Sequence, residues 1–235
     1  MKKNLTELVF IVDRSGSMGG LESDTIGGLN ATLAKNREVE GECVVSIVLF
    51  DNTSEVLVDR QPIEQVPNLT TAQYQVRGCT ALLDAVGDSV RYIEKVQQIL
   101  PEDYRAEHVI FAIITDGLEN ASRHRTYPEV KHMIEARQED GWEFIFLGAN
   151  IDAAAEAGRM GIRADRASNY VSDVAGSALA YEAMACAQVS RRKTGAVASS
   201  WRDAPMADAA ARGGAAGGTG SRKPAKKKGL KFWQK

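Results

Sequence analysis

The segment IVDRSGSMGG (residues 11–20) ends an apolar run at an aspartate and continues with an arginine, two serines and three glycines. The run that it closes, LTELVFIVD (5–13), is rich in β-branched and aromatic residues. This composition is typical of a strand buried on both faces of a parallel sheet. Ligand sites in α/β sheets form at the carboxyl ends of such strands. The segment therefore predicts a central strand followed by a polar site.

Four further segments have the character of strands. HVIFAIITD (108–116) and WEFIFLGAN (142–150) resemble the first run, and SNYVSD (168–173) is a shorter one. CVVSIVLFDNTSEVLVDRQ (43–61) contains two runs separated by the turn composition DNTS, which predicts an antiparallel hairpin at one edge of the sheet.

Helical patterns separate these strands, over about residues 22–39, 81–99, 127–140, 152–159 and 175–190. Alternating strands and helices at this spacing indicate right-handed β-α-β units. The predicted fold class is α/β, with a doubly wound, mostly parallel sheet, one antiparallel edge strand and helices on both faces.

Composition divides the chain into two parts. With 235 residues, of which 44% are hydrophobic, the chain has enough material for one sizeable core. We expect a folded domain over residues 1–192 and a flexible segment over 193–235, rich first in glycine and alanine and then in lysine. From residue 213 on there are seven Lys or Arg and no acid, whereas the preceding residues carry 22 basic and 31 acidic side chains. The body is therefore acidic and the tail basic.

The tail GGAAGGTGSRKPAKKKGLKFWQK is predicted to be disordered, since so few apolar residues cannot form a core. Phe232 and Trp233 among the lysines suggest an arm that binds nucleic acid or an anionic surface, or a short docking peptide. The alternatives are a solvated charged tail and one that folds back on the acidic body.

The start of the chain contains only a brief apolar run, LVFIV, which is too short for a signal peptide or a membrane span. We expect a cytoplasmic protein. The cysteines Cys43, Cys79 and Cys186 are widely spaced and show no metal-ligand pattern, so reduced thiols are expected.

Candidate ligands follow the ends of two predicted strands and precede one helix. Asp13, Ser15 and Ser17 share one turn, Thr80 stands just before a helix, and Asp116 ends the strand over 108–116. Carboxylate and hydroxyl oxygens are the ligands that Mg²⁺ prefers. Taken singly, each residue also suits a helix cap or a turn.

The motifs DRSGS (13–17), GCTALLDAV around Thr80, and TDG (115–117) resemble the three-part metal-ion-dependent adhesion site of von Willebrand factor A domains. The resemblance covers about residues 5–190, and GCTALLDA and TDGLENAS are similar to intracellular bacterial or phage members. It implies that Asp13, Ser15, Ser17, Thr80 and Asp116 hold Mg²⁺ or Mn²⁺. It also implies an open coordination position that accepts an Asp or Glu from a partner protein.

An enzyme that transfers phosphoryl groups with Mg²⁺ is the catalytic alternative, because Asp13 ends a strand as the nucleophile of such enzymes does. Such chemistry uses a second acid two residues later, and here that residue is Ser15. The histidines His108, His124 and His132 lack ligand spacing. The sequence therefore predicts a binding protein without catalytic residues.

Overall fold

Strand β1 (Lys2–Asp13) lies near the centre of a six-stranded sheet in the computed structural model, which describes residues 1–212. The spatial order is β3-β2-β1-β4-β5-β6. Every neighbouring pair is parallel except β2 with β3, which are antiparallel at one edge. The predicted α/β fold class is confirmed, the edge hairpin included. The other strands are β2 (Glu42–Phe50), β3 (Ser54–Pro62), β4 (Ala106–Thr115), β5 (Glu143–Ala149) and β6 (Ala167–Tyr170).

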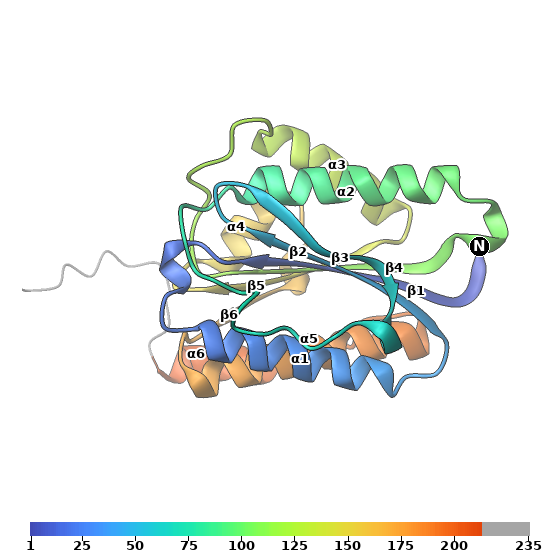
Figure 1. Ribbon diagram of the computed structural model, residues 1–235. Coiled ribbons are helices and arrows are strands. Elements are labelled where there is room, and N and C mark those ends of the chain that lie inside the picture. The colour runs from blue at the N-terminus through green and yellow to red at the C-terminus, as the bar shows by residue number, and fades with distance from the viewer. Residues whose placement is uncertain (213–235) are drawn as a thin grey trace, which may run out of the picture.

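Helices cover both faces of this sheet, as Figure 1 shows. One face is covered by α1 (Glu22–Arg37) and α5 (Val174–Thr194). The other is covered by α2 (Leu82–Ile99), α3 (Tyr127–Glu139) and α4 (Ala153–Arg159). A further helix, α6 (Asp203–Ala211), packs against α5 and β6. Short 3-10 turns complete the fold: η1 (Gly16–Met18), η2 (Ile63–Gln65), η3 (Glu102–Tyr104) and η4 (Ala164–Arg166).

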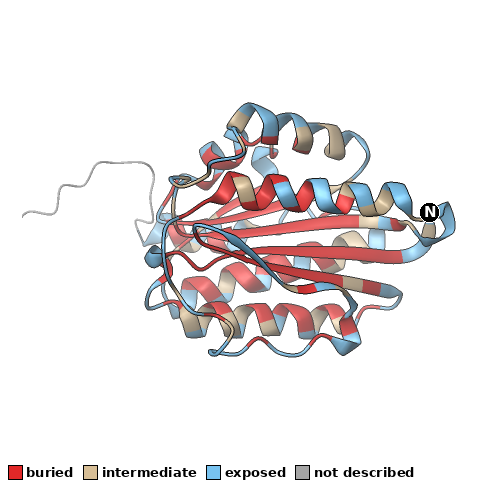
Figure 2. Cartoon of the chain, turned by 45° about the horizontal axis from the view of Figure 1, so that its top comes forward, coloured by how far each residue is buried: buried red, intermediate tan, exposed pale blue. Residues whose placement is uncertain are grey.

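Alternation along β1 creates two hydrophobic cores. Leu8, Phe10 and Val12 face α1 and α5, while Val9 and Ile11 face α2. Successive strand side chains point to opposite faces, so a strand covered on both sides must be apolar throughout. Figure 2 shows the consequence: the strands are buried along most of their length, and the helices are buried where they face the sheet.

The predicted domain limit at residue 192 is wrong. Helix α5 continues to Thr194, and α6 follows it. Trp201 is only 5% exposed, and its indole N–H donates to the Asp165 carbonyl at 2.9 Å. The alanine-rich sequence here resembles a linker in composition, and it is the packing of Trp201 that makes it part of the fold. The predicted disordered segment from residue 213 on lies outside the described residues.

The three cysteines are free thiols, as expected, with Cys43 buried and Cys79 and Cys186 exposed. No helix within residues 1–212 combines the length and the apolar character needed to cross a membrane.

Replacing Trp201 with alanine tests whether the segment after residue 192 belongs to the fold. Truncating a buried tryptophan costs about 3–5 kcal/mol, which lowers the Tm by roughly 6–20 °C for a fold of this size. Differential scanning calorimetry measures the change. Ile99→Ala, at an exposed position, is the control and is expected to leave the Tm within about 2 °C. An unchanged Tm for Trp201→Ala would contradict the packing described here.

Candidate metal centre

The parallel pairing of β1 with β4 brings two acidic side chains to one edge of the sheet. Val12 lies opposite Ile114 in this pairing. Asp13 is the last residue of β1, and Asp116 directly follows the last residue of β4. Since parallel strands end at the same edge, both carboxylates lie there together.

Hydroxyl groups connect the two carboxylates. The Ser15 backbone N–H donates to Asp13 Oδ1 at 2.7 Å. The Ser15 and Ser17 hydroxyl oxygens are 3.1 Å apart, and Thr80 Oγ1 donates to Ser15 Oγ at 3.0 Å. Ser17 Oγ donates to Asp116 Oδ1 at 2.5 Å. The structure thus brings all five predicted site residues into one cluster, while their role as metal ligands stays a prediction.

Burial makes this cluster electrostatically unfavourable without a cation. Asp13 is completely buried, and Asp116 is 5% exposed. Burial raises the pKa of Asp13, although hydrogen bonds from Thr115 and Ser15 act in the opposite direction. Burial also raises the pKa of Asp116, and the nearby charge of Asp13 adds to this increase. Hydrogen bonds thus offset the burial of the two carboxylates only in part, and a bound cation would favour their charged forms.

The donor set fits a hard divalent cation. It consists of two carboxylates and three hydroxyls, without nitrogen or sulfur, which is the chemistry that Mg²⁺ and Mn²⁺ favour. Within residues 1–212, no group of three or more His, Cys, Asp or Glu side chains is placed to hold a metal ion, and this cluster has only two such side chains. A metal ion here would therefore depend largely on the three hydroxyls.

Two glycines allow the loops to approach one another. Gly78 has a φ of +72°, and its carbonyl accepts the Gly16 N–H at 3.0 Å. Such a backbone conformation favours glycine strongly. A Cβ at Gly117 would lie 3.2 Å from Ser17 Oγ and 3.3 Å from Thr80 Oγ1. A side chain at residue 117 would therefore crowd the two hydroxyls.

Helix capping does not explain Thr80. The residue that precedes α2 is Ala81, and its side chain makes no cap. The first turn of α2 is instead capped from another loop, where Glu119 Oε2 accepts the Leu83 N–H at 2.9 Å and Ser122 Oγ accepts the Asp84 N–H at 3.0 Å. The Thr80 hydroxyl is thus directed to Ser15 and not to the helix.

Sequence reasoning missed the residues that hold the ligands in place. Thr115 Oγ1 donates to Asp13 Oδ2 at 2.6 Å and accepts the Gly117 N–H at 3.1 Å. Asn120 Oδ1 accepts the Thr80 N–H at 2.9 Å. Both residues lie in the stretch TDGLEN (115–120). Thr115 directly precedes Asp116 and Asn120 follows it by four residues, so their closeness to Asp116 in sequence could have identified them.

Arg14 is buried and follows Asp13 in the sequence, but its guanidinium group binds other acidic side chains. Its Nε donates to Asp51 Oδ2 at 2.9 Å, and its Nη1 donates to Glu55 Oε2 at 2.6 Å. Arg77 donates to the same Asp51 oxygen at 2.8 Å. Burial alone would raise the pKa of Asp51, but hydrogen bonds from Arg77, Thr53 and Arg14 hold it below its usual value. The Arg14 charge is therefore balanced within this group.

Several solved structures share this fold. The pilus adhesin SpaC of Lactobacillus rhamnosus GG aligns over 81% of this chain and 31% of its own, with a TM-score of 0.57 and 10% identity. Proximal thread matrix protein 1 from the mussel byssus aligns over 77% of this chain and 45% of its own, with a TM-score of 0.53 and 13% identity. A von Willebrand factor type A structure from Catenulispora acidiphila aligns over 80% and 43%, with a TM-score of 0.51 and 15% identity.

This chain matches less than half the length of each of these proteins. Neither the protein-family models nor the curated proteins include a match to the sequence. The likeness is therefore one of fold.

Thr115→Val tests the positioning role of Thr115. Valine keeps the size of the side chain but loses the hydroxyl that orients Asp13, and loss of such an outer partner weakens metal affinity by about 10–100-fold. Titration calorimetry with Mn²⁺ measures the affinity. Thr6→Val, a buried threonine nearer the other end of β1, is the matched control and should leave the affinity unchanged. Equal affinities in both variants would refute the role.

Proposed function

Because the chain has the von Willebrand factor A fold, we propose that it is a divalent-metal-dependent protein-binding module. In this proposal Asp13, Ser15, Ser17, Thr80 and Asp116 hold Mg²⁺ or Mn²⁺, and the ion accepts an Asp or Glu side chain of a partner protein. The observation that carries the proposal is the convergence of these two carboxylates and three hydroxyls at one edge of the sheet.

The ligand count leaves room for an external group. Mg²⁺ takes six oxygen ligands, and this cluster offers five side chains. With only two carboxylates in the set, the ion retains more positive character than in a site rich in acids. In a partly desolvated position it would attract an acidic side chain strongly. Binding this acidic side chain of the partner is what the ion would contribute.

The cluster is open on one side. Asp13, Ser15 and Thr80 are buried, whereas Ser17 and the adjacent Gly16 are exposed. A partner side chain would therefore approach past Ser17. Leu118 follows Asp116 and Gly117 in the sequence and is 52% exposed. Its side chain offers the partner an apolar contact near this opening.

The proposal assigns no catalytic step to this site. The residue two positions after Asp13 is Ser15, and its hydroxyl lies against Thr80 and Ser17 in place of the second acid used in phosphoryl transfer. His108 is paired with Thr6 and so lies toward the other end of β4 from Asp116. SpaC, which shares the fold, is a pilus adhesin, and this is consistent with a binding role.

Asp13→Asn tests metal binding. The substitution preserves the shape of the side chain but removes one of the two carboxylates. We expect the affinity for Mg²⁺ and Mn²⁺ to fall by at least about 100-fold, because losing a ligand should cost more than losing a residue that only orients a ligand. Titration calorimetry measures the affinity, and circular dichroism checks that the fold is retained. Asp103→Asn, at an exposed residue, controls for the change in charge. Unchanged affinity in Asp13→Asn would overturn the metal assignment.

Thr80→Val tests partner binding. The full chain, immobilised in Mg²⁺, should capture a partner that is released by a chelator, and Thr80→Val should weaken this capture more than it weakens metal uptake. The reason is that in related domains the threonine binds the ion in the partner-bound state, so its loss disfavours that state. Changing the partner's Asp and Glu residues to Asn and Gln should then locate one essential acid. Equal capture in excess chelator would place recognition elsewhere.

A further inference from the structure

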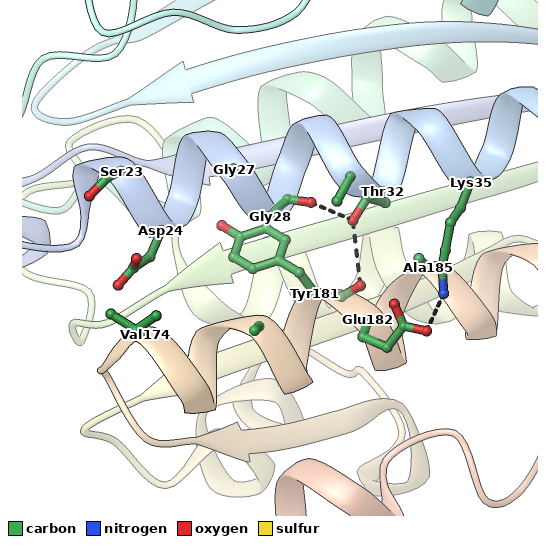
Figure 3. A pocket seen from close by; sticks show the side chains of 12 residues that line it. Ser23, Asp24, Gly27, Gly28, Thr32, Lys35, Val174, Tyr181, Glu182 and Ala185 are labelled. Atoms are coloured by element: carbon green, nitrogen blue, oxygen red, sulfur yellow. Dashed lines mark hydrogen bonds and ion pairs between the residues drawn. The ribbon is translucent and has the colours of Figure 1, made fainter.

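A groove on the surface runs between α1 and α5, and none of the five metal-ligand candidates lines it. Its walls are formed by small residues of the two helices, chiefly Gly27, Gly28 and Ala31 of α1 and Ala178 and Ala185 of α5. It encloses about 350 Å³, a size within the range of ligand pockets. Figure 3 shows the groove with the side chains that line it.

Tyr181 is a buried residue that lines this groove. Its ring packs on Gly28, where a Cβ would lie 2.3 Å from Tyr181 Cδ2. The side chain is 3% exposed, yet its hydroxyl has no hydrogen-bond partner within residues 1–212. The hydroxyl oxygen is closed off from solvent, so it lies behind the groove surface and is not itself a contact for a ligand in the groove.

The rest of the groove combines acidic and apolar contacts. Asp24 lies at one end, beside Val174, which is 73% exposed. Glu182 lies toward the other end, where it pairs with Lys35. A ligand suited to these features is apolar in its centre and carries positive charge.

The described chain ends beside this groove. Arg212 donates to Asp173, the N-cap of α5, at 2.5 Å. A Cβ at Gly176 would lie 3.0 Å from Arg212 Nη2. The side chain of the last described residue therefore reaches the N-terminal end of α5. A chain of this length, residues 213–235, spans up to about 75 Å when extended, so its end reaches any part of the groove.

We propose that residues 213–235 bind in the α1–α5 groove of their own chain, with Phe232 and Trp233 in the hollow and the neighbouring lysines beside Asp24 and Glu182. The segment carries seven basic residues and no acid, whereas residues 1–212 have an excess of acids. Tethering gives an effective concentration in the millimolar range, so a modest affinity is enough for occupancy.

Zero-length carbodiimide cross-linking of the full chain tests this proposal, because it joins lysine amines only to carboxylates in contact with them. Mass spectrometry should find Lys226, Lys227, Lys228 or Lys231 joined to Asp24 or Glu182. The double variant Phe232→Ser/Trp233→Ser should reduce these links by at least about tenfold, as expected for loss of buried aromatic anchors. It leaves every lysine in place, so a purely electrostatic association would survive it.

Ala31→Arg tests the groove itself. Ala31 is exposed and lines the groove, so arginine there introduces bulk and positive charge with little cost to the helix. We expect the same loss of cross-links. Ala34→Arg, exposed on the same helix but outside the groove, is the matched control and should retain them. Cross-links that persist equally in Ala31→Arg, or that spread over the acids of α2 and α3, would overturn the proposal.

A mixture of ¹⁵N-labelled and unlabelled full-length protein shows whether residues 213–235 bind in the groove of their own chain or in that of a second copy. Links within one chain join peptides of the same isotope, and we expect only these. Links that join labelled with unlabelled peptides would show that a second copy supplies the segment, which would overturn docking within one chain.

Discussion

The parallel pairing of β1 with β4 is the interaction on which the rest of the structure depends. Eight residues of β1 pair with β4, and nine pair with β2 on its other side. This register brings Asp13 and Asp116 to one edge. Because β1 is buried on both faces, a slip of one residue would exchange its two faces and displace the carboxylate from the site. The geometry of the cluster is therefore fixed by the core.

Hydrogen bonds from the backbone and from outer side chains then hold the loops in position. The Gly16 N–H binds the Gly78 carbonyl, and Thr80 exchanges hydrogen bonds with Asn120, whose N–H donates to the Thr80 carbonyl at 3.0 Å. The Tyr74 hydroxyl donates to the Asp13 carbonyl. These contacts restrict the ligands before any ion binds, so less conformational entropy is lost on binding than in a flexible loop.

Helix α1 connects the loop that carries Asp13, Ser15 and Ser17 to the groove. This helix begins at Glu22, four residues after the buried Met18 of η1, and its first turns line the groove through Ser23 and Asp24. Its other side packs in the core through Leu29 and Leu33. Small residues on the face toward α5 let the two helices approach closely, and Tyr181 occupies the space above Gly28. The groove is thus a consequence of how α1 and α5 pack.

The sequence alone predicted the fold class, the six strands, helices α1 to α5 and the five candidate ligands, because hydrophobic periodicity is local and because a polar turn after a buried strand is visible in the residue order. DRSGS, GCT and TDG could be identified in this way. Tertiary structure alone decided which groups orient the ligands, since Thr115 and Asn120 act through contacts between loops distant in sequence. It also decided that the chain folds on past residue 192 through Trp201, and that Tyr181 lies in a groove without a hydrogen-bond partner in residues 1–212. Burial depends on what packs against a residue, and this is a property of the assembled layers and not of any one segment.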